Sequence, residues 1–78
     1  MSLAIIYSNR NQECERAQAL MESLRHEYLV YHLGDEFTEG QFRNEFGDNA
    51  PYPQISIGVN HVGTLKDALQ YFLAQDVL

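Results

Sequence analysis

The spacing of hydrophobic residues changes along the chain, and each change indicates a different element of secondary structure. Leu3–Tyr7 is a continuous apolar run, which predicts a buried central strand. From Glu13 onward the apolar residues recur at steps of three and four, which predicts an amphipathic helix with Asn11 as its N-cap. The segment Glu27–Leu33 is rich in residues that favour strands and is followed by Gly34, so it predicts a second strand.

The second half of the chain predicts two helices and a hairpin. Thr38–Gln41 has the form of a capping box, which predicts the start of a short helix that ends at Gly47. Gln54–Ile57 alternates polar and apolar residues, and the turn after it leads to a short strand near His61–Val62. Leu65–Ala74 has apolar residues at helical spacing and predicts the last helix.

The predicted order of elements is β-α-β-α-β-β-α, which indicates an α/β layer fold. A β-α-β start implies a parallel pair of strands joined by a right-handed crossover. The later hairpin adds antiparallel neighbours, so we expect a mixed four-stranded sheet with helices on its faces. The 78 residues contain neither a linker nor a repeat, and residues 1–78 are therefore expected to form a single domain.

Composition narrows the classes of partner and the cellular compartment. Eleven acidic residues against five basic ones give a net charge of −6, which argues against nucleic acid and against an anionic membrane as partner. The residues before Leu3 carry no basic segment, and no apolar stretch is long enough to span a bilayer, so neither a signal peptide nor a membrane anchor is expected. One cysteine cannot form an internal disulfide, which fits a cytoplasmic protein.

Four segments, taken in order, resemble one protein family. I-I-Y-S at 5–8 and C-E-R-A-Q-A-L at 14–20 are similar to the first strand and the first helix of glutaredoxins, on either side of their active-site loop. P-Y-P-Q-I-S-I at 51–57 and H-V-G-T-L-K-D at 61–67 are similar to two later motifs of that family. Because all four keep the family's order and spacing over nearly the whole chain, the sequence resembles the short bacterial and phage-type glutaredoxins.

The resemblance implies a thioredoxin-like fold and a relation to glutathione-dependent thiol–disulfide oxidoreductases. Glutaredoxins carry C-x-x-C or C-x-x-S, and the first cysteine is the nucleophile at the start of a helix. Residues 11–14 read N-Q-E-C here, which places Asn11 at the position of the nucleophile and Cys14 at that of the resolving cysteine. The active site therefore resembles a degenerate one, and we expect dithiol exchange to be weak or missing.

Cys14, the candidate catalytic residue, has two interpretations. A helix N-terminus and a nearby cation such as Arg10 favour a thiolate, whereas the carboxylates of Glu13 and Glu15 disfavour it. Cys14 also shares an apolar stripe with Ala17, which makes a buried thiol of low reactivity the preferred interpretation. The alternative is a monothiol redox protein that uses Cys14 to form and exchange mixed disulfides with glutathione.

The resemblance also implies a glutathione-binding site, made by the following residues: Arg10, Tyr52, Pro53, Gly63, Thr64 and Asp67. In the family, the proline before the third strand is cis, so Pro53 would be cis. The backbone of Tyr52 would then pair with a thiol peptide as a strand edge does. Amide groups at the start of the last helix hold a ligand carboxylate, which is the role implied for Gly63 and Thr64.

Other parts of this implied site are less close to the family pattern. Asp67 would receive the ammonium group of the ligand, although Lys66 occupies the family's first acidic position. Arg10 and Arg43 are candidates for the glycyl carboxylate of glutathione, and a solvated surface charge is the plain alternative for each. Thr64 is a good N-cap even if no ligand binds there. Pro53 shapes the loop whether or not a ligand binds. The acidic residues within 35–39 are most simply a solvated face.

The leading hypothesis is a glutaredoxin-like module that binds glutathione or a thiol-containing peptide or protein and requires no cofactor. His26, His32 and His61 lie on different predicted elements without metal-ligand spacing, so we expect no metal site. The alternatives are the monothiol enzyme and a purely structural domain whose apolar surface pairs with another chain. The sequence does not predict the oligomeric state.

Overall fold

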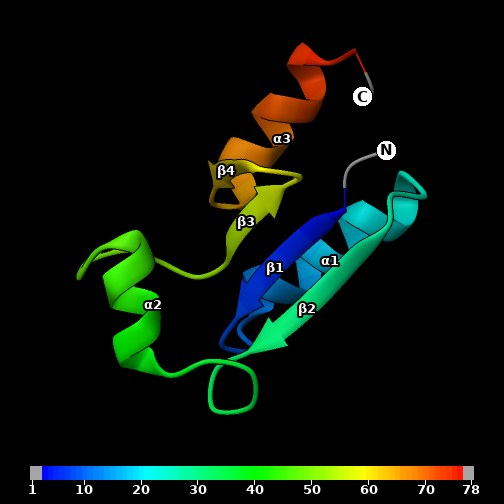
Figure 1. Ribbon diagram of the computed structural model, residues 1–78. Helices are drawn as coiled ribbons and strands as arrows, with labels where there is room; N and C mark the ends of the chain where they lie inside the picture. The colour runs from blue at the N-terminus through cyan, green and yellow to red at the C-terminus, as the bar shows by residue number, and fades with distance from the viewer. Residues whose placement is uncertain (1–2, 77–78) are drawn as a thin grey trace.

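The computed structural model describes residues 3–76, which form a mixed sheet and three helices (Figure 1). The strands are β1 (Ala4–Ser8), β2 (Tyr28–His32), β3 (Gln54–Ile57) and β4 (Asn60–Gly63). The helices are α1 (Gln12–Ser23), α2 (Glu39–Phe46) and α3 (Leu65–Ala74). The order along the chain is the predicted one, and it confirms the α/β class.

The sheet has the strand order β2-β1-β3-β4, so β1 is a central strand as predicted. β1 pairs parallel with β2, where Ile6 lies opposite Val30, and antiparallel with β3, where Ile6 lies opposite Ile55. β3 and β4 form the predicted antiparallel hairpin. The expected mixed four-stranded sheet is thereby confirmed.

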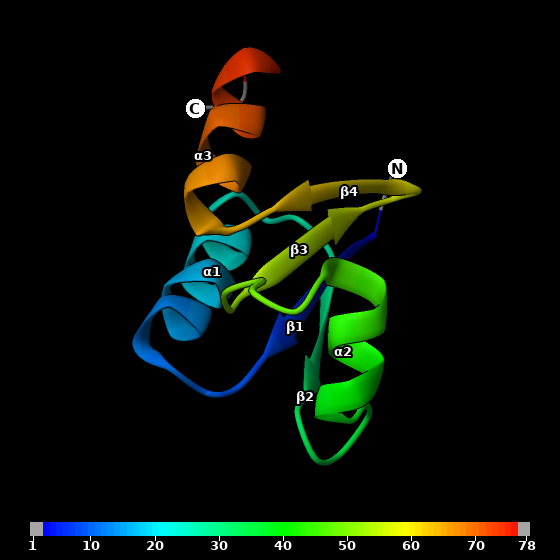
Figure 2. The ribbon, with the colours of Figure 1, turned by 90° about the vertical axis from the view of Figure 1, so that its left-hand side faces the viewer.

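Helices cover both faces of the sheet. Figures 1 and 2 show α1 and α3 on one face and α2 on the other. Side chains of a strand alternate between the faces. The buried Ala4 and Ile6 of β1 therefore point towards α1 and α3, and Tyr7 lies on the α2 face. The core between the sheet, α1 and α3 consists of these buried residues: Ala4, Ile6, Ala17, Met21, Ile55, Ile57, Ala68 and Phe72.

All three helices begin at the side-chain caps that the sequence predicts. Asn11 is the N-cap of α1, and its Oδ1 accepts a hydrogen bond from the backbone N–H of Cys14 at 2.8 Å. Thr38 and Thr64 are the N-caps of α2 and α3, and each forms a complete capping box. Because a cap of this kind contributes about 1 kcal/mol, these residues fix where each helix starts.

Candidate functional site

The chain segments that carry the predicted site meet at one end of the sheet, which we call the site end. β1, β2 and β4 end there and β3 begins there, because Tyr7 lies opposite Gln54 and Ile55 lies opposite Gly63. The turn into α1, the loop before β3 and the turn into α3 are therefore neighbours, as Figure 2 shows. The fold brings together residues that are 41 positions apart, such as Asn11 and Tyr52.

Cys14 lies beneath the first turn of α1 and is fully buried. Its Sγ is 3.7 Å from Oδ1 of Asn9, to which the thiol donates a weak hydrogen bond. The flanking residues Glu13 and Glu15 are exposed. A thiol must reach the disulfide that it attacks, and a buried sulfur cannot do so without an opening of the structure. The position of Cys14 is therefore that of a small packed side chain.

Asn11 and Tyr52 contact each other across the site end. Nδ2 of Asn11 lies 3.5 Å from the carbonyl oxygen of Tyr52, which is a long and weak hydrogen bond. The preceding carbonyl, that of Pro51, accepts a 2.8 Å hydrogen bond from Nε2 of Gln54. Oε1 of Gln54 in turn lies 2.7 Å from Nε2 of His61. Gln54 thus fixes the loop, whereas an extended ligand can displace the weak contact at Tyr52.

The loop before β3 has the backbone form that the resemblance implied. The Tyr52–Pro53 peptide bond is cis, and Pro53 is fully buried. The ring of Tyr52 stacks on Phe42 of α2, with centroids 4.1 Å apart and an angle of 14° between the rings. Burial, together with the charge of Glu39, raises the pKa of Tyr52. The side chain of Tyr52 therefore anchors the loop to α2.

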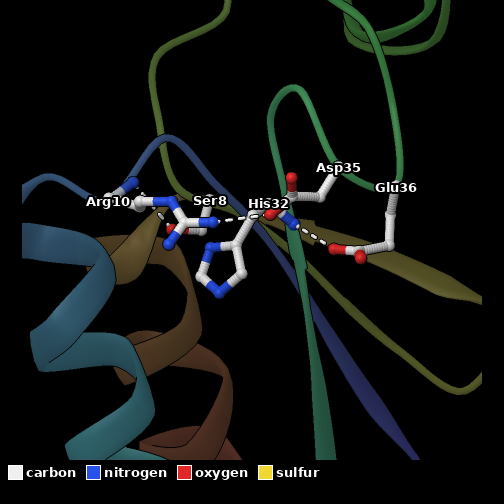
Figure 3. Close-up of polar contacts among 5 residues, drawn as sticks. All are labelled: Ser8, Arg10, His32, Asp35 and Glu36. Carbon is white, nitrogen blue, oxygen red and sulfur yellow. Dashed lines mark hydrogen bonds and ion pairs between the residues drawn. The ribbon is translucent and has the colours of Figure 1, made fainter.

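Arg10 pairs with Asp35 from the loop after β2, as Figure 3 shows. Nη2 of Arg10 lies 2.6 Å from Oδ2 of Asp35, and the Arg10 backbone N–H donates to Oγ of Ser8 at 2.9 Å. Both charged side chains are more than half exposed, so this ion pair is worth about 1 kcal/mol or less. The guanidinium group is thus held at the site end, and a ligand carboxylate can compete for it.

In the turn into α3, the carboxylate of Asp67 binds the groups that would hold an anionic ligand. Oδ2 of Asp67 accepts hydrogen bonds from the backbone N–H and the hydroxyl of Thr64, both at 3.0 Å. These bonds hold the pKa of Asp67 below its ordinary value. Gly63 has a φ of +121°, and a Cβ at this position would collide with the Asp67 carboxylate. An anionic ligand would therefore compete with Asp67 for the amide of Thr64.

Sequence reasoning did not identify two residues of the site end, Asp35 and Gln54. Asp35 is exposed, in agreement with the expected solvated face, but its pairing with Arg10 joins residues 25 positions apart, which no local pattern reveals. Gln54 is 4% exposed, and a polar residue that opens a buried strand is a signal that could have identified it. Arg43 lies on α2, where it pairs with Glu39 at 3.3 Å.

Comparison with known proteins does not assign a family. A scan against protein-family models and a search of curated proteins found no match for this chain. Across residues 3–76, no helix has the length and the apolar character that crossing a membrane requires. In the same part of the chain, no three His, Cys, Asp or Glu side chains gather to hold a metal ion.

Proposed function

We propose that this protein is a glutaredoxin-like binding module with a degenerate active site. It binds glutathione, or a thiol-containing peptide or protein segment, at the site end and catalyses dithiol exchange weakly or not at all. One observation carries this proposal: the chain's only thiol, that of Cys14, is fully buried, while Asn11 occupies the start of α1.

The fold supports the proposal that the domain is thioredoxin-like. β1 and β2 form a parallel pair joined through α1, and β3 and β4 form an antiparallel hairpin on the other side of β1. This arrangement places a helix N-terminus, a proline loop and a second helix N-terminus at one end of the sheet. It is the layout that the four glutaredoxin-like segments imply.

The chemistry of the site end suits a short peptide with free carboxylates. The Tyr52 backbone offers strand-edge pairing, because its carbonyl makes only a weak 3.5 Å contact with Asn11. Arg10 supplies a positive charge that is held in place by an exposed ion pair. The start of α3 offers backbone amides to an anion, in competition with Asp67.

The rival function, a monothiol enzyme, needs an exposed sulfur. Exchange begins when the thiolate attacks a disulfide sulfur, and the burial of Cys14 opposes this step. Binding without exchange therefore fits the site better. A cytoplasmic location is part of the proposal, because a lone cysteine fits a reducing compartment.

Binding is tested with S-methylglutathione, which keeps the peptide groups of glutathione but cannot exchange disulfides. Amide NMR signals of Tyr52, Thr64 and the Asn11 side chain should shift in a saturable way. Arg10→Ala should weaken binding about threefold or more, whereas the matched change Arg16→Ala on exposed α1 surface should not. No shift at the site end at millimolar ligand, or equal effects of the two variants, would count against the proposed site.

A further inference from the structure

A second surface lies on the face of the sheet that α2 covers. Here an open groove of about 400 Å³ runs between α2 and the strands β1 and β2, and we call it the aromatic groove. It is lined by the following residues: Tyr7, Tyr31, Glu36, Phe37, Gln41, Phe42, Glu45 and Phe46. None of the residues of the proposed glutathione site belongs to this lining, although Tyr52 of that site stacks on Phe42 of the groove.

Aromatic rings form most of the groove. Tyr7 is at their centre, with its ring centroid 5.0 Å from Phe46, 5.5 Å from Phe37 and 5.6 Å from Tyr31. The three rings meet Tyr7 at angles of 61° to 80°, so the four do not form one parallel stack. Phe37 is buried, whereas Tyr7, Tyr31 and Phe46 are only half-buried and remain open to a partner. Aromatic ring faces attract cations.

Two carboxylates line the same groove. Oε1 of Glu36 accepts a 2.7 Å hydrogen bond from the backbone N–H of His32, which holds this residue in place. Burial raises the pKa of Tyr7, and the charges of Tyr31 and Glu45 add to this effect, so the field of the Glu45 carboxylate reaches the Tyr7 phenol. The lining contains no lysine, arginine or histidine among the described residues. The groove is therefore aromatic and negatively charged.

Two arginines of this chain, Arg10 and Arg43, already pair with carboxylates outside the groove lining. The ion pairs of residues 3–76 join Arg10 to Asp35 and Arg43 to Glu39, and Glu45 takes part in neither. The net charge of −6 further favours a basic partner over an acidic one. The negative charge and the aromatic rings of the groove together thus favour a cationic group from another molecule.

We propose that the aromatic groove receives an arginine side chain of a partner protein, which lies against the outer surface of the Tyr7–Phe46 ring pair and next to the Glu45 carboxylate. A guanidinium group is planar, stacks on aromatic rings and donates paired hydrogen bonds to a carboxylate, whereas an ammonium group does not stack. The groove volume of about 400 Å³ also leaves room for backbone atoms beside the arginine. The groove residues named here are not those of the proposed glutathione site, so the proposal does not rest on glutathione binding.

The probe is the peptide acetyl-Gly-Arg-Gly-amide, followed by NMR, with citrulline and lysine versions of the same peptide as controls. The arginine peptide should shift the signals of Tyr7 and Phe46, and the uncharged citrulline peptide should bind at least about fivefold more weakly. Glu45→Gln should also weaken binding about fivefold, while the matched change Glu15→Gln on α1 should not. Both glutamates are exposed, so both variants should fold.

Several results would overturn this assignment. Equal binding of the citrulline peptide, or equal effects of Glu45→Gln and Glu15→Gln, would show that charge does not determine recognition. Equal binding of the lysine peptide would show that the groove does not select arginine over lysine. Shifts of Tyr7 and Phe46 on raising the protein concentration alone, with a dimer seen by sedimentation, would assign the groove to a second copy of this chain.

Discussion

The side chain of Asn11 accepts a 2.8 Å hydrogen bond from the backbone N–H of Cys14, and this contact opens helix α1. Asn11 thus has a structural role, and under the proposed relation to glutaredoxins it stands at the position of their attacking cysteine. Cys14, three residues later, faces the interior and is fully buried. Asn11 therefore caps the helix, and Cys14 packs in the interior.

Asn11→Cys should create a measurable disulfide-exchange activity. The new thiol would lie at the start of α1, where the helix dipole favours a thiolate, and Cys14 would follow at C-x-x-C spacing. The loss of the cap should cost about 1 kcal/mol of folding stability. The assay is reduction of a small glutathione mixed disulfide, and Gln12→Cys is the matched control. Equal rates for the two variants would contradict the proposed alignment with glutaredoxins.

Cys14→Ala and Cys14→Ser should destabilise the domain without changing ligand binding. Cys14→Ala removes a fully buried sulfur, for which we expect a loss of about 1 kcal/mol in the free energy of unfolding. Cys14→Ser places a hydroxyl group in the same space and should cost at least as much. Urea denaturation measures these losses. Unchanged stability in both variants, or loss of S-methylglutathione binding by folded protein, would argue that Cys14 acts at the surface.

Gly63→Ala should be strongly destabilising compared with Gly40→Ala. Gly63 has a left-handed φ of +121°, and an added Cβ would collide with the Asp67 carboxylate, so we expect a loss of about 1–3 kcal/mol. Gly40 lies within α2 and an added Cβ there meets its nearest atom, Oγ1 of Thr38, at 3.9 Å. Gly40→Ala should therefore stabilise the domain by about 0.5–1 kcal/mol. Thermal unfolding of both variants measures this difference, and similar unfolding midpoints would show that Gly63 is not under the steric constraint described here.

Acid should destabilise the N-terminus of α3, because the Asp67 carboxylate that caps it becomes protonated. The hydrogen bonds from Thr64 hold the pKa of Asp67 below its ordinary value of 3.8, so the folded state favours the charged carboxylate. This contribution is fully present above the ordinary pKa and is lost as the pH falls through the lowered pKa of the folded state. The unfolding free energy of the wild type should therefore fall more steeply below about pH 4 than that of Asp67→Asn. Parallel curves would show that the capping carboxylate has no such effect.

Sequence patterns predicted most of the fold because most of its signals are local. The caps at Asn11, Thr38 and Thr64 lie beside the helices that they start, and hydrogen-bond geometry within four residues determines them. The alternation of Ile55, Ser56 and Ile57 predicts the buried side of β3, and the helical spacing within Leu65–Ala74 predicts that Ala68 and Phe72 of α3 are buried, whereas the polar Gln54 departs from this pattern.

The contacts of the site were less predictable because they join segments that are distant in the sequence. The Arg10–Asp35 pair spans 25 residues, and the Asn11–Tyr52 contact spans 41. Tyr7 belongs to the central strand that the apolar run predicts, and its ring lies on the α2 face, where it forms the centre of the aromatic groove. Such contacts depend on how the elements pack, which spacing alone does not determine.

The burial and low reactivity of Cys14 can be tested by the reaction of the native protein with glutathione disulfide at neutral pH, followed by intact mass. Cys14 is the only thiol, so an adduct forms only if its thiolate attacks the disulfide and releases one glutathione. We expect no adduct over minutes with folded protein and a single glutathione adduct once denaturant exposes the sulfur. A rapid adduct on folded protein would contradict this expectation and would identify Cys14 as the reactive thiol of a monothiol enzyme.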